Sequence, residues 1–390
     1  MMYQKMKDIF EKVYGDSEGI RVFFAPGRVN LIGEHTDYNG GHVFPCALTL
    51  GTYAAVRKRD DNIIRMYSEN ITEGLVVERE LGDYTIYNKK SWSNYPFGVI
   101  WALDKRGNKL TCGYDIAYYG NIPGGAGLSS SASIEVLTAY MFNELCGFDI
   151  SLLDISLLCQ YSENNYNGMN CGIMDQFASA MGKENRAIFL DTATLEYEYA
   201  PIELDDKIIL IINSNVKHSL GSSKYNERRK ESEAALCALK QRLDIETLGD
   251  LDEEEFNKNK DLISNPVERK RAKHAVYENR RTINAYNALK RGDIEEFGRL
   301  MIESHLSLRD DYEVSCKEID CIVDLGMKCD GVYGIRITGG GFGGCCVSIV
   351  DADKADEVIS YIGSRYKKAV GYGASFYTVK AGGGPCEVKG

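Results

Sequence analysis

The sequence predicts a protein of mixed helices and strands, with a chain long enough for two domains. Its 390 residues exceed the usual size of one domain, and 44% apolar with 26% charged residues is the composition of a globular protein. Segments with strand-like apolar runs and segments with a helical period intermix along the chain. No internal repeat or low-complexity tract interrupts them.

The first half of the chain begins with a predicted helix and continues in strands and helices. MMYQKMKDIFEKVYG has the pattern of an amphipathic helix and lacks an apolar core of signal-peptide length. Short apolar runs with β-branched residues predict strands around 21–24 and 43–57, and an alternating pattern predicts strand over 62–87. Apolar positions at a helical period predict helices over 133–146 and 151–166.

The second half is predicted to place charged helices between strands. Strand signals return over 186–212, and 222–312 is mostly charged helix, with 274–289 and 294–309 as separate units. After these helices, GIRITGGGFGGCCVSIV predicts two strands around a glycine cluster.

The net charge argues against a nucleic-acid partner. Basic residues number 46 and acidic residues 57, which gives 46 − 57 = −11. An acidic chain gains no counterion-release energy on a phosphate backbone. Basic clusters at 228–230 and 269–271 lie among acidic residues, and we expect them to be solvated helix faces.

The cysteines and the apolar runs indicate a cytoplasmic protein. Twelve cysteines occur without a C-x-x-C pair, and their scatter through apolar segments predicts reduced, mostly buried thiols. The longest aliphatic run, 208–212, is far shorter than a membrane span, so we expect no membrane partner.

The stretch APGRVNLIGEHTDYNGG, residues 25–41, combines charges of both signs, a histidine and four glycines. The stretch is too polar for a core strand, because it contains Arg28, Glu34, His35 and Asp37. A solvated loop, in turn, would not need the short apolar run inside the stretch. We interpret the stretch as a binding loop for a small ligand rich in hydroxyl groups. For His35, the alternative is a structural histidine with satisfied hydrogen bonds.

A second glycine-rich stretch, PGGAGLSSSASIEV, precedes a predicted helix. Its glycines let the backbone pass close to a ligand, and a helix N-terminus is a natural seat for phosphate. A serine N-cap is the alternative, but three consecutive serines favour an anion site. No G-K-[ST] follows, so the stretch is not a Walker A loop, and no protein-kinase motif set accompanies it.

A third glycine-rich stretch, TGGGFGG, spans residues 338–344. Gly339, Gly341 and Gly344 match G-x-G-x-x-G, whose dinucleotide-binding form requires a helix to follow. Here CCVSIV follows and predicts a strand, which disfavours an NAD-dependent oxidoreductase. A flexible turn placed against a ligand or another loop fits better.

Two acidic residues accompany these motifs. Asp175 lies in GMNCGIMDQFASAMG at the start of a short helical pattern, where a capping role and a chemical role are equally open. Glu163, in QYSENNYNG, ends the preceding predicted helix, and its local sequence favours a solvated helix-end acid.

Taken in chain order, these stretches resemble the GHMP small-molecule kinases. GRVNLIGEHTDYNGG is similar, nearly residue for residue, to the sugar-binding signature of the members that phosphorylate galactose. GAGLSSSAS resembles the phosphate loop of the family, CGIMDQF the segment of its catalytic aspartate, and RITGGGFGG its third motif. SHLSLRDDYEVSC also resembles the galactose-specific members, and the resemblance covers essentially the whole chain.

The resemblance implies the two-domain α+β fold of the family, with the active site in the cleft between the domains. An N-terminal domain over 1–195 would contain the galactose-binding signature (about 20–45) and the phosphate loop (123–133). A C-terminal domain over 196–390 would contain the glycine motif 338–344, and the final strand is free to return to the N-terminal domain.

Matching positions imply residue roles. Asp175 would take the proton from the sugar C1 hydroxyl with Arg28 beside it, since a guanidinium keeps a nearby carboxylate ionised. Whether Asp175 is a true base or a positioning anion stays open, because a loose phosphoryl-transfer state demands little early deprotonation. The implied substrate-binding residues are Glu34, His35, Asp37, Gly172 and Tyr225.

The same resemblance implies a nucleotide site and a metal site. The implied nucleotide-binding residues are Gly124, Gly125, Ala126, Gly127, Leu128, Ser129, Ser130 and Ser131. Ser131 and Glu163 match the Mg²⁺ ligands of the family, and two protein ligands plus phosphates are usual for Mg²⁺. Trp92 and Tyr95 resemble the segment near the adenine, with ordinary core aromatics as an equal alternative.

The implied activity is ATP-dependent phosphorylation of α-D-galactose at C1, the first step of galactose catabolism. Galactose, ATP and Mg²⁺ would be the partners of a cytoplasmic enzyme, which we expect to be a monomer. The alternatives are a kinase for another sugar, such as N-acetylgalactosamine or arabinose, and a non-catalytic galactose sensor. The complete serine loop favours catalysis.

Overall fold

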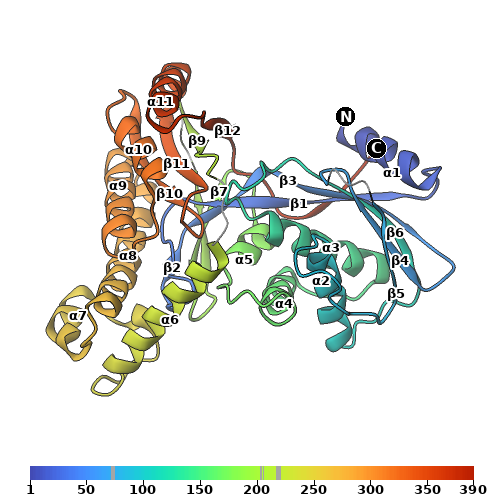
Figure 1. The fold of residues 1–390 in the computed structure, drawn as a ribbon, viewed down its shortest axis with the longest axis horizontal. Helices are drawn as coiled ribbons and strands as arrows, with labels where there is room; N and C mark the ends of the chain where they lie inside the picture. Colours follow the sequence, from blue (N-terminus) through green and yellow to red (C-terminus); the bar gives the residue numbers. More distant parts are fainter. Residues whose placement is uncertain (72–74, 203, 205, 217–220) are drawn as a thin grey trace.

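A long central strand, β1 (Arg21–Asn30), joins the two halves of the molecule (Figure 1). The computed structural model describes residues 1–390 except 72–74, 203, 205 and 217–220. The first part of β1 lies in a six-stranded sheet, whereas Val29 near its end packs in the same core as Ile209 and Val347 of a four-stranded sheet. One strand therefore contributes to both hydrophobic cores.

The six-stranded sheet has the order β13-β1-β3-β6-β4-β5 and is antiparallel except for the parallel pair β4–β6. Its other strands are β3 (Pro45–Lys58), β4 (Ile63–Ser68), β5 (Val77–Glu80), β6 (Tyr114–Gly120) and β13 (Cys386–Val388). The register of β1 against β3 shifts between Pro26 and Arg28. A β-bulge of this kind re-aims the following side chain, and here that side chain is Arg28.

Helices cover both faces of this sheet. Those on one face are α2 (Asn94–Lys105), α3 (Ser130–Cys146), α4 (Leu152–Asn165) and α5 (Met174–Met181), and α1 (Met2–Tyr14) covers the other (Figure 1). Side chains alternate across a strand, so Phe23 packs under α3 while its neighbour Val22 packs against α1. The helix α3 is buried along most of its length, since buried apolar or small residues occur at almost every turn.

The four-stranded sheet has the order β10-β11-β9-β12 and carries helices on both faces. Its elements are β9 (Lys207–Asn213), β10 (Val332–Thr338), β11 (Cys345–Asp351) and β12 (Ser375–Val379), with α8 (Pro266–Lys290) and α9 (Ile294–Asp310) on one face and α10 (Lys317–Gly326) and α11 (Ala355–Val370) on the other. Ile209 and Ile211 face the first layer, and Leu210 and Ile212 face the second. This burial on both faces explains the continuous aliphatic run at 208–212.

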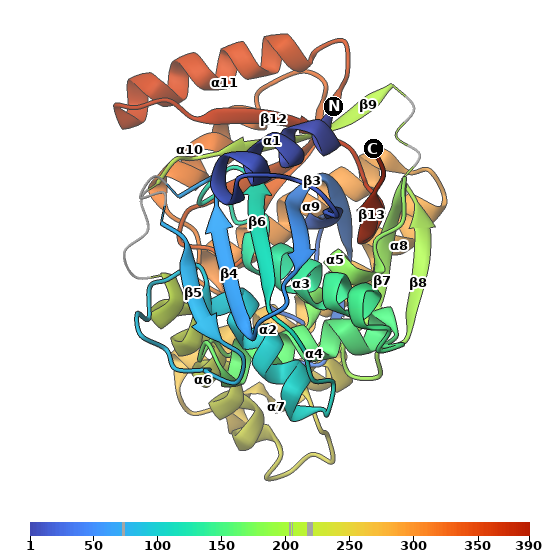
Figure 2. The same cartoon turned by 90° about the vertical axis from the view of Figure 1, so that its right-hand side faces the viewer.

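The remaining elements link these layers. A third sheet has the order β2-β7-β8, and its strands are β2 (His42–Val43), β7 (Arg186–Asp191) and β8 (Tyr197–Pro201). The other helices are α6 (Gly221–Leu239), α7 (Glu253–Asn259) and the short 3₁₀ helices Leu248–Asp250 and Lys260–Leu262. Figure 2 shows α7 and α11 at opposite ends of the molecule. None of the helices in the described part of the chain combines the length and apolarity that a membrane span requires.

Most of the predicted elements are present. The amphipathic N-terminal segment is α1, the helices predicted over 133–146 and 151–166 are α3 and α4, and β10 and β11 flank the glycine cluster. The strand predicted over 62–87 is too long: among its described residues only β4 and β5 are strands. Gly82, with φ 90°, closes a turn directly after β5 and ends the ladder there.

The two basic clusters are only partly solvated. Arg271 on α8 is 1% exposed, and its guanidinium donates to Glu231 at 2.7 Å and to Glu313 at 2.8 Å. Arg228 on α6 is also partly buried. The prediction of solvated faces is wrong for these two arginines, because residues distant in the sequence supply the acceptors that make burial of a guanidinium tolerable.

All twelve cysteines are free thiols, as predicted. The buried ones are Cys46, Cys159, Cys345 and Cys346, six others are partly buried, and Cys237 and Cys386 are exposed. The prediction of mostly buried thiols therefore holds fully for only four of the twelve.

The chain crosses the predicted domain division within one hairpin. β7 and β8 pair antiparallel on either side of residue 195. At the end of the chain β13 pairs with β1, with Val388 opposite Val22, so the last strand lies in the N-terminal sheet. The division at residue 195 stays a prediction.

The close contact between α9 and β10 depends on a glycine. A Cβ added at Gly298 on α9 would lie 2.0 Å from the backbone oxygen of Tyr333. Gly298→Ala should therefore lower the free energy of unfolding by about 1–3 kcal/mol, because backbone on both sides must move. Urea denaturation of the purified chain measures this loss.

Gly363→Ala in α11 is the matched control, since its added Cβ would lie 3.3 Å from the edge of the Phe376 ring, which can shift. Alanine also favours a helix over glycine, so this variant should match the parent or exceed it in stability. Equal stability of Gly298→Ala and the parent would contradict the steric argument.

Candidate functional site

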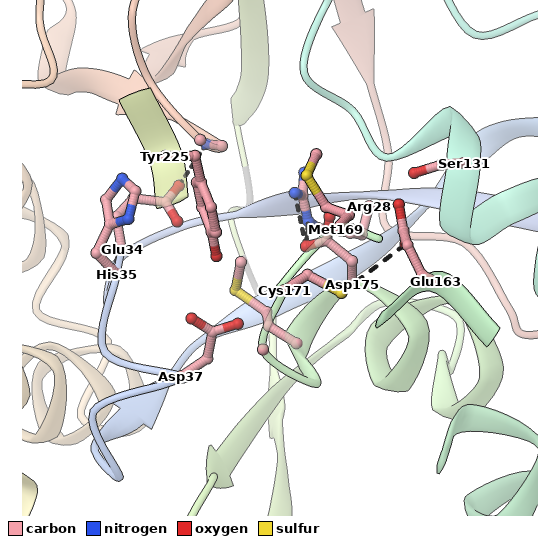
Figure 3. Close-up of a pocket in the computed structure, with 14 residues that line it drawn as sticks. Arg28, Glu34, His35, Asp37, Ser131, Glu163, Met169, Cys171, Asp175 and Tyr225 are labelled. Atoms are coloured by element: carbon pink, nitrogen blue, oxygen red, sulfur yellow. Dashed lines mark hydrogen bonds and ion pairs between the residues drawn. The ribbon is translucent and has the colours of Figure 1, made fainter. Parts of the chain in front are cut away.

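One cavity of about 150 Å³ brings the predicted site residues together (Figure 3). It is lined by side chains from both sides of residue 195, namely Arg28, Glu34, His35, Asp37, Ser131, Glu163, Met169, Cys171, Gly172, Met174, Asp175, Tyr225, Gly339 and Gly340. Every residue predicted to be catalytic, sugar-binding or metal-binding is in this set. In Figure 3, Arg28 and Asp175 lie between Asp37 and Tyr225 on one side and Glu163 and Ser131 on the other.

An ion pair between Arg28 and Asp175 forms the centre of the cavity. Nε and Nη2 of Arg28 both lie 2.7 Å from Oδ1 of Asp175, and Nη1 donates to the backbone oxygen of Gly127 at 2.8 Å. The Arg28 side chain is 4% exposed and that of Asp175 is 30% exposed, so the carboxylate is the partner that faces the cavity. Asp175 lies in the first turn of α5 without capping it, so the capping alternative is wrong.

The phosphate-loop stretch reaches the same carboxylate through Ser129. This residue occupies the N-cap position of α3 in a left-handed conformation (φ 57°, ψ 52°) and makes no side-chain cap bond. Instead its hydroxyl donates to Oδ2 of Asp175. The serine N-cap alternative is therefore wrong for Ser129, and a non-glycine residue held at positive φ is typical of a site constrained by its surroundings.

The rest of the loop is open to solvent. Gly124, Gly125, Gly127 and Ser130 are exposed at the N-terminus of α3, where backbone N–H groups lack helical partners. Ala126 and Leu128 are buried in the core that β1 shares with the four-stranded sheet and anchor the loop. This combination of a fixed frame and exposed N–H groups is suited to binding an anion.

Glu34 connects the first and third motifs. Its Oε1 accepts hydrogen bonds from the backbone N–H of Gly339 at 2.6 Å and from the Thr338 hydroxyl at 3.0 Å, and Arg336 lies 3.3 Å away. Its Oε2 accepts one bond, from Asn30 at 2.8 Å. A carboxylate oxygen has two lone pairs, so Oε2 keeps an acceptor site.

His35 and Asp37 follow Glu34 on the same turn. His35 has φ 61°, and its Nδ1 lies 2.8 Å from the Tyr38 hydroxyl while its buried Nε2 has no hydrogen-bond partner among the described residues. Burial raises the pKa of Asp37 from 3.8 to about 7, and the nearby Asp175 and Glu34 charges add to this shift. A Cβ at Gly172 would lie 2.0 Å from an Asp37 carboxylate oxygen, so a larger residue at 172 would displace this carboxylate.

A second group of acids lies behind Asp175. Glu163 at the end of α4 is 5% exposed, and its Oε2 accepts a hydrogen bond of 2.6 Å from Gln176. Burial and the Asp175 charge raise the pKa of Glu163 to about 7, and burial raises that of the neighbouring Glu135 well above its usual value. The solvated role favoured by local sequence is wrong for Glu163, because the packing of α3, α4 and α5 encloses it.

The aromatic residues assigned to adenine lie outside the cavity lining. Trp92 packs against the helical face of the six-stranded sheet, with its ring 5.7 Å from that of Tyr118. Burial raises the pKa of Tyr95 to about 12, with the charges of Glu163 and Glu135 contributing. Their contact with a nucleotide stays a prediction.

Several residues of the site were not identified from the sequence. Met169, Cys171 and Met174 line the cavity, and Gln176 and Glu135 lie behind Glu163. One signal was available, because Glu135 follows Ser131 by one helical turn and i, i+4 positions share a helix face. The methionines and the cysteine carry no pattern that distinguishes them from core residues.

Comparison with known proteins agrees with this arrangement. Residues 8–58 match the family model described as galactokinase galactose-binding signature, 94–183 the GHMP kinases N terminal domain, and 285–368 the GHMP kinases C terminal model. The galactokinase of Bacillus subtilis is 49% identical over 389 residues, covering 100% of both chains. That of Clostridium acetobutylicum is 51% identical over 384 residues, covering 98% of this chain and 97% of its own.

Solved structures match over the same length. The crystal structure of Lactococcus lactis galactokinase complexed with galactose superposes with a TM-score of 0.97 at 43% identity, covering 100% of both chains. A mevalonate kinase structure superposes with a TM-score of 0.64 at 20% identity, covering 93% of this chain and 98% of its own, which shows a shared fold.

The raised pKa of Asp37 predicts a stability effect with a definite sign. The folded chain keeps the Asp37 proton up to a pH of about 7, whereas the unfolded chain loses it near 3.8. Asp37 therefore lowers the stability of the folded chain as the pH rises from about 4 to 7, and this loss is constant above 7. Asp37→Asn should raise the stability at pH 8 by about 1–3 kcal/mol, and this gain should fade toward pH 4.

Urea denaturation at pH 8 and pH 5, without added ligands, measures this difference. Asp206→Asn is the control, because a hydrogen bond from Lys207 lowers the pKa of this exposed acid and its removal should bring no gain at pH 8. A gain from Asp37→Asn of the same size at both pH values would contradict the assignment of the raised pKa.

Proposed function

The chain belongs to the galactokinases of the GHMP kinase family, and we propose that it transfers the γ-phosphoryl group of ATP to the C1 hydroxyl of α-D-galactose. The products are α-D-galactose 1-phosphate and ADP. The observation that carries the assignment of roles is the Arg28–Asp175 pair, whose carboxylate faces a cavity with hydroxyl-binding side chains on one side and the phosphate loop on the other.

Asp175 positions the sugar hydroxyl that attacks the phosphate. Arg28 holds its Oδ1 and Ser129 its Oδ2, so the carboxylate cannot rotate and remains an acceptor for the C1 hydroxyl. Because phosphoryl transfer passes through a loose transition state, orientation and charge stabilisation contribute more than early proton removal, and the proton moves to Asp175 as the bond forms.

Sugar recognition rests on the turn after β1. Asp37 accepts hydroxyl hydrogens, His35 and Tyr225 contribute the facing polar atoms, and Glu34 offers its free Oε2 lone pair while its other bonds hold the turn in place. Gly172 lets Asp37 approach the ring. A site that pairs each hydroxyl rejects epimers strongly, because a misplaced hydroxyl leaves a buried polar group unpaired.

The residues beside Asp175 fit a magnesium ion. Glu163 is buried close to the Asp175 carboxylate, and burial together with the Asp175 charge raises its pKa, a cost that a bound cation would relieve. No three His, Cys, Asp or Glu side chains among the described residues form a metal site by themselves. Ser131 and Glu163 would therefore hold Mg²⁺ together with ATP phosphates, and the ion would neutralise phosphate charge.

The nucleotide would bind across the phosphate loop. The exposed backbone N–H groups at the start of α3 and the positive end of that helix favour the ATP phosphates at this point. Ser130 adds an exposed hydroxyl, and Trp92 and Tyr95 on or near α2 are the residues that we assign to the adenine side.

Replacement of Asp175 tests the catalytic assignment. Asp175→Asn keeps the size of the side chain but removes its charge, and kcat should fall by about a thousandfold while galactose binding persists. ADP release from Mg-ATP, measured with galactose, N-acetylgalactosamine, glucose, arabinose and no sugar, gives both the rate and the preferred substrate.

The exposed Asp60→Asn is the matched control and should behave like the parent. Near-full activity of Asp175→Asn would refute the role of Asp175. If turnover is strongest with a sugar other than galactose, residues 34–37 and 225 would be specific for that sugar instead. Galactose binding without turnover in the parent would support a sensor instead.

Replacement of Glu163 tests the metal assignment. Glu163→Gln should raise the Mg²⁺ concentration needed for half-maximal activity by about tenfold or more, because a neutral amide oxygen is a weaker ligand than a carboxylate. Activity should vanish with a chelator and return with Mg²⁺. Glu196→Gln serves as control, because Glu196 is an exposed acid that does not line the cavity. Identical Mg²⁺ titrations for Glu163→Gln and the parent would show that Glu163 is no ligand.

A further inference from the structure

We propose that Ser232, Tyr312 and Tyr38 form a hydroxyl relay that fixes the proton of His35 on Nε2 and so makes this nitrogen a hydrogen-bond donor to a sugar hydroxyl. The three are positioning residues, since they act on the substrate through His35. The inference rests on the proposed function in that the ligand of the cavity is a sugar.

The relay is a continuous chain of short contacts. The Ser232 hydroxyl lies 2.8 Å from the Tyr312 hydroxyl, which lies 2.8 Å from the Tyr38 hydroxyl, which in turn lies 2.8 Å from Nδ1 of His35. Ser232 and Tyr312 are fully buried, so water does not compete for these contacts. The chain ends at the cavity, because His35 is one of its lining residues.

The second ring nitrogen of His35 is available to a ligand of the cavity. His35 is 4% exposed, and its Nε2 has no hydrogen-bond partner among the described residues. A buried polar atom without a partner is costly, and a ligand hydroxyl in the adjoining cavity would remove this cost. Burial lowers the pKa of His35 to about 3, assisted by His274 and Arg228, so the ring is neutral and carries a single proton.

The composition of the cavity favours that proton on Nε2. Four carboxyl groups belong to the lining, and each of them accepts hydrogen bonds when it is ionised: Glu34, Asp37, Glu163 and Asp175. Arg28 already directs Nε, Nη1 and Nη2 to Asp175 and to the Gly127 oxygen. Each sugar hydroxyl has lone pairs as well as a hydrogen, so a lining rich in carboxyl groups also needs donors, and Nε2 of His35 would be one beside the Tyr225 hydroxyl.

Donation by Nε2 determines the direction of the whole relay. With the proton on Nε2, Nδ1 must accept from the Tyr38 hydroxyl. Tyr38 then accepts from Tyr312, and Tyr312 accepts from Ser232. Each hydroxyl donates one bond in this order. The opposite order would place the proton on Nδ1 and leave Nε2 as one more acceptor in the lining.

The relay links distant parts of the chain to the sugar-binding turn. Ser232 lies on α6, and Tyr312 follows α9 in the stretch SHLSLRDDYEVSC. Arg228 donates to the backbone oxygen of Tyr312 at 2.8 Å, and the Tyr312 ring lies 4.8 Å from the His35 ring. These contacts fix the position of the Tyr312 side chain relative to the His35 ring.

Nuclear magnetic resonance of ¹⁵N-histidine tests the relay directly. The chain has five histidines, and the His35 signals are assigned by their absence in His35→Gln. The parent should show a protonated Nε2 and an unprotonated Nδ1, with or without galactose. Tyr38→Phe and Tyr312→Phe should shift the proton toward Nδ1 or produce a mixture. A protonated Nδ1 in the parent would overturn the proposal.

Binding measurements test the consequence for the sugar. Tyr38→Phe and Tyr312→Phe should weaken galactose binding by about tenfold, the effect of losing one oriented hydrogen bond, with the KM for ATP unchanged. Ser232→Ala removes the far end of the relay without touching the turn and should have a smaller effect in the same direction. Calorimetry with galactose gives the affinity, and circular dichroism confirms that each variant is folded.

Tyr14→Phe is the matched control. It also removes a partly buried hydroxyl, which donates to the backbone oxygen of Ile116 at 3.0 Å on the outer face of the six-stranded sheet. It should bind galactose like the parent. Unchanged galactose affinity in both Tyr38→Phe and Tyr312→Phe would refute the relay. If the parent itself fails to bind galactose, the proposed function fails, and the histidine signals still decide whether the relay sets the tautomer.

Discussion

The buried guanidinium of Arg28 is the constraint on which the active site depends. A charged group that is 4% exposed is tolerable only when a counter-charge lies beside it and its N–H groups have hydrogen-bond acceptors. Asp175 on α5 supplies the counter-charge, and the Gly127 oxygen accepts a hydrogen bond from Nη1. The Arg28 backbone N–H also donates to the Leu128 oxygen, so β1, α5 and the phosphate loop can assemble in only one arrangement.

The glycine cluster after β10 extends this arrangement to the second half of the molecule. A Cβ at Gly339 would lie 2.9 Å from the Gly127 oxygen, and its N–H donates to Glu34. Glycine is required there because backbone meets backbone. The stretch 123–133 and the turn after β1 therefore share one neighbour, the glycine cluster after β10. This explains a motif that has the spacing, but not the following helix, of a dinucleotide site.

The site is held together at a cost in stability. Asp37, Glu135 and Glu163 are acids whose pKa values are raised mainly by burial, and they lie near a fourth acid, Asp175. A core of this composition is unfavourable without ligands, and a sugar with a bound cation would supply the missing hydrogen bonds and positive charge. The same features that weaken the free protein therefore prepare it to bind its substrates.

The sequence by itself determined the motifs, their order and most of the elements, because these depend on local periodicity, on glycine conformation and on a signature as long as residues 25–41. The tertiary structure alone decided the environment of each polar group. Local sequence favoured a solvated Glu163 and solvated arginines at 228 and 271, whereas packing encloses all three. Tyr38, which bonds to His35, likewise finds its own partner in Tyr312, far along the chain, and Tyr312 in turn contacts Ser232. Burial and partner choice depend on contacts between distant segments, and no local pattern records them.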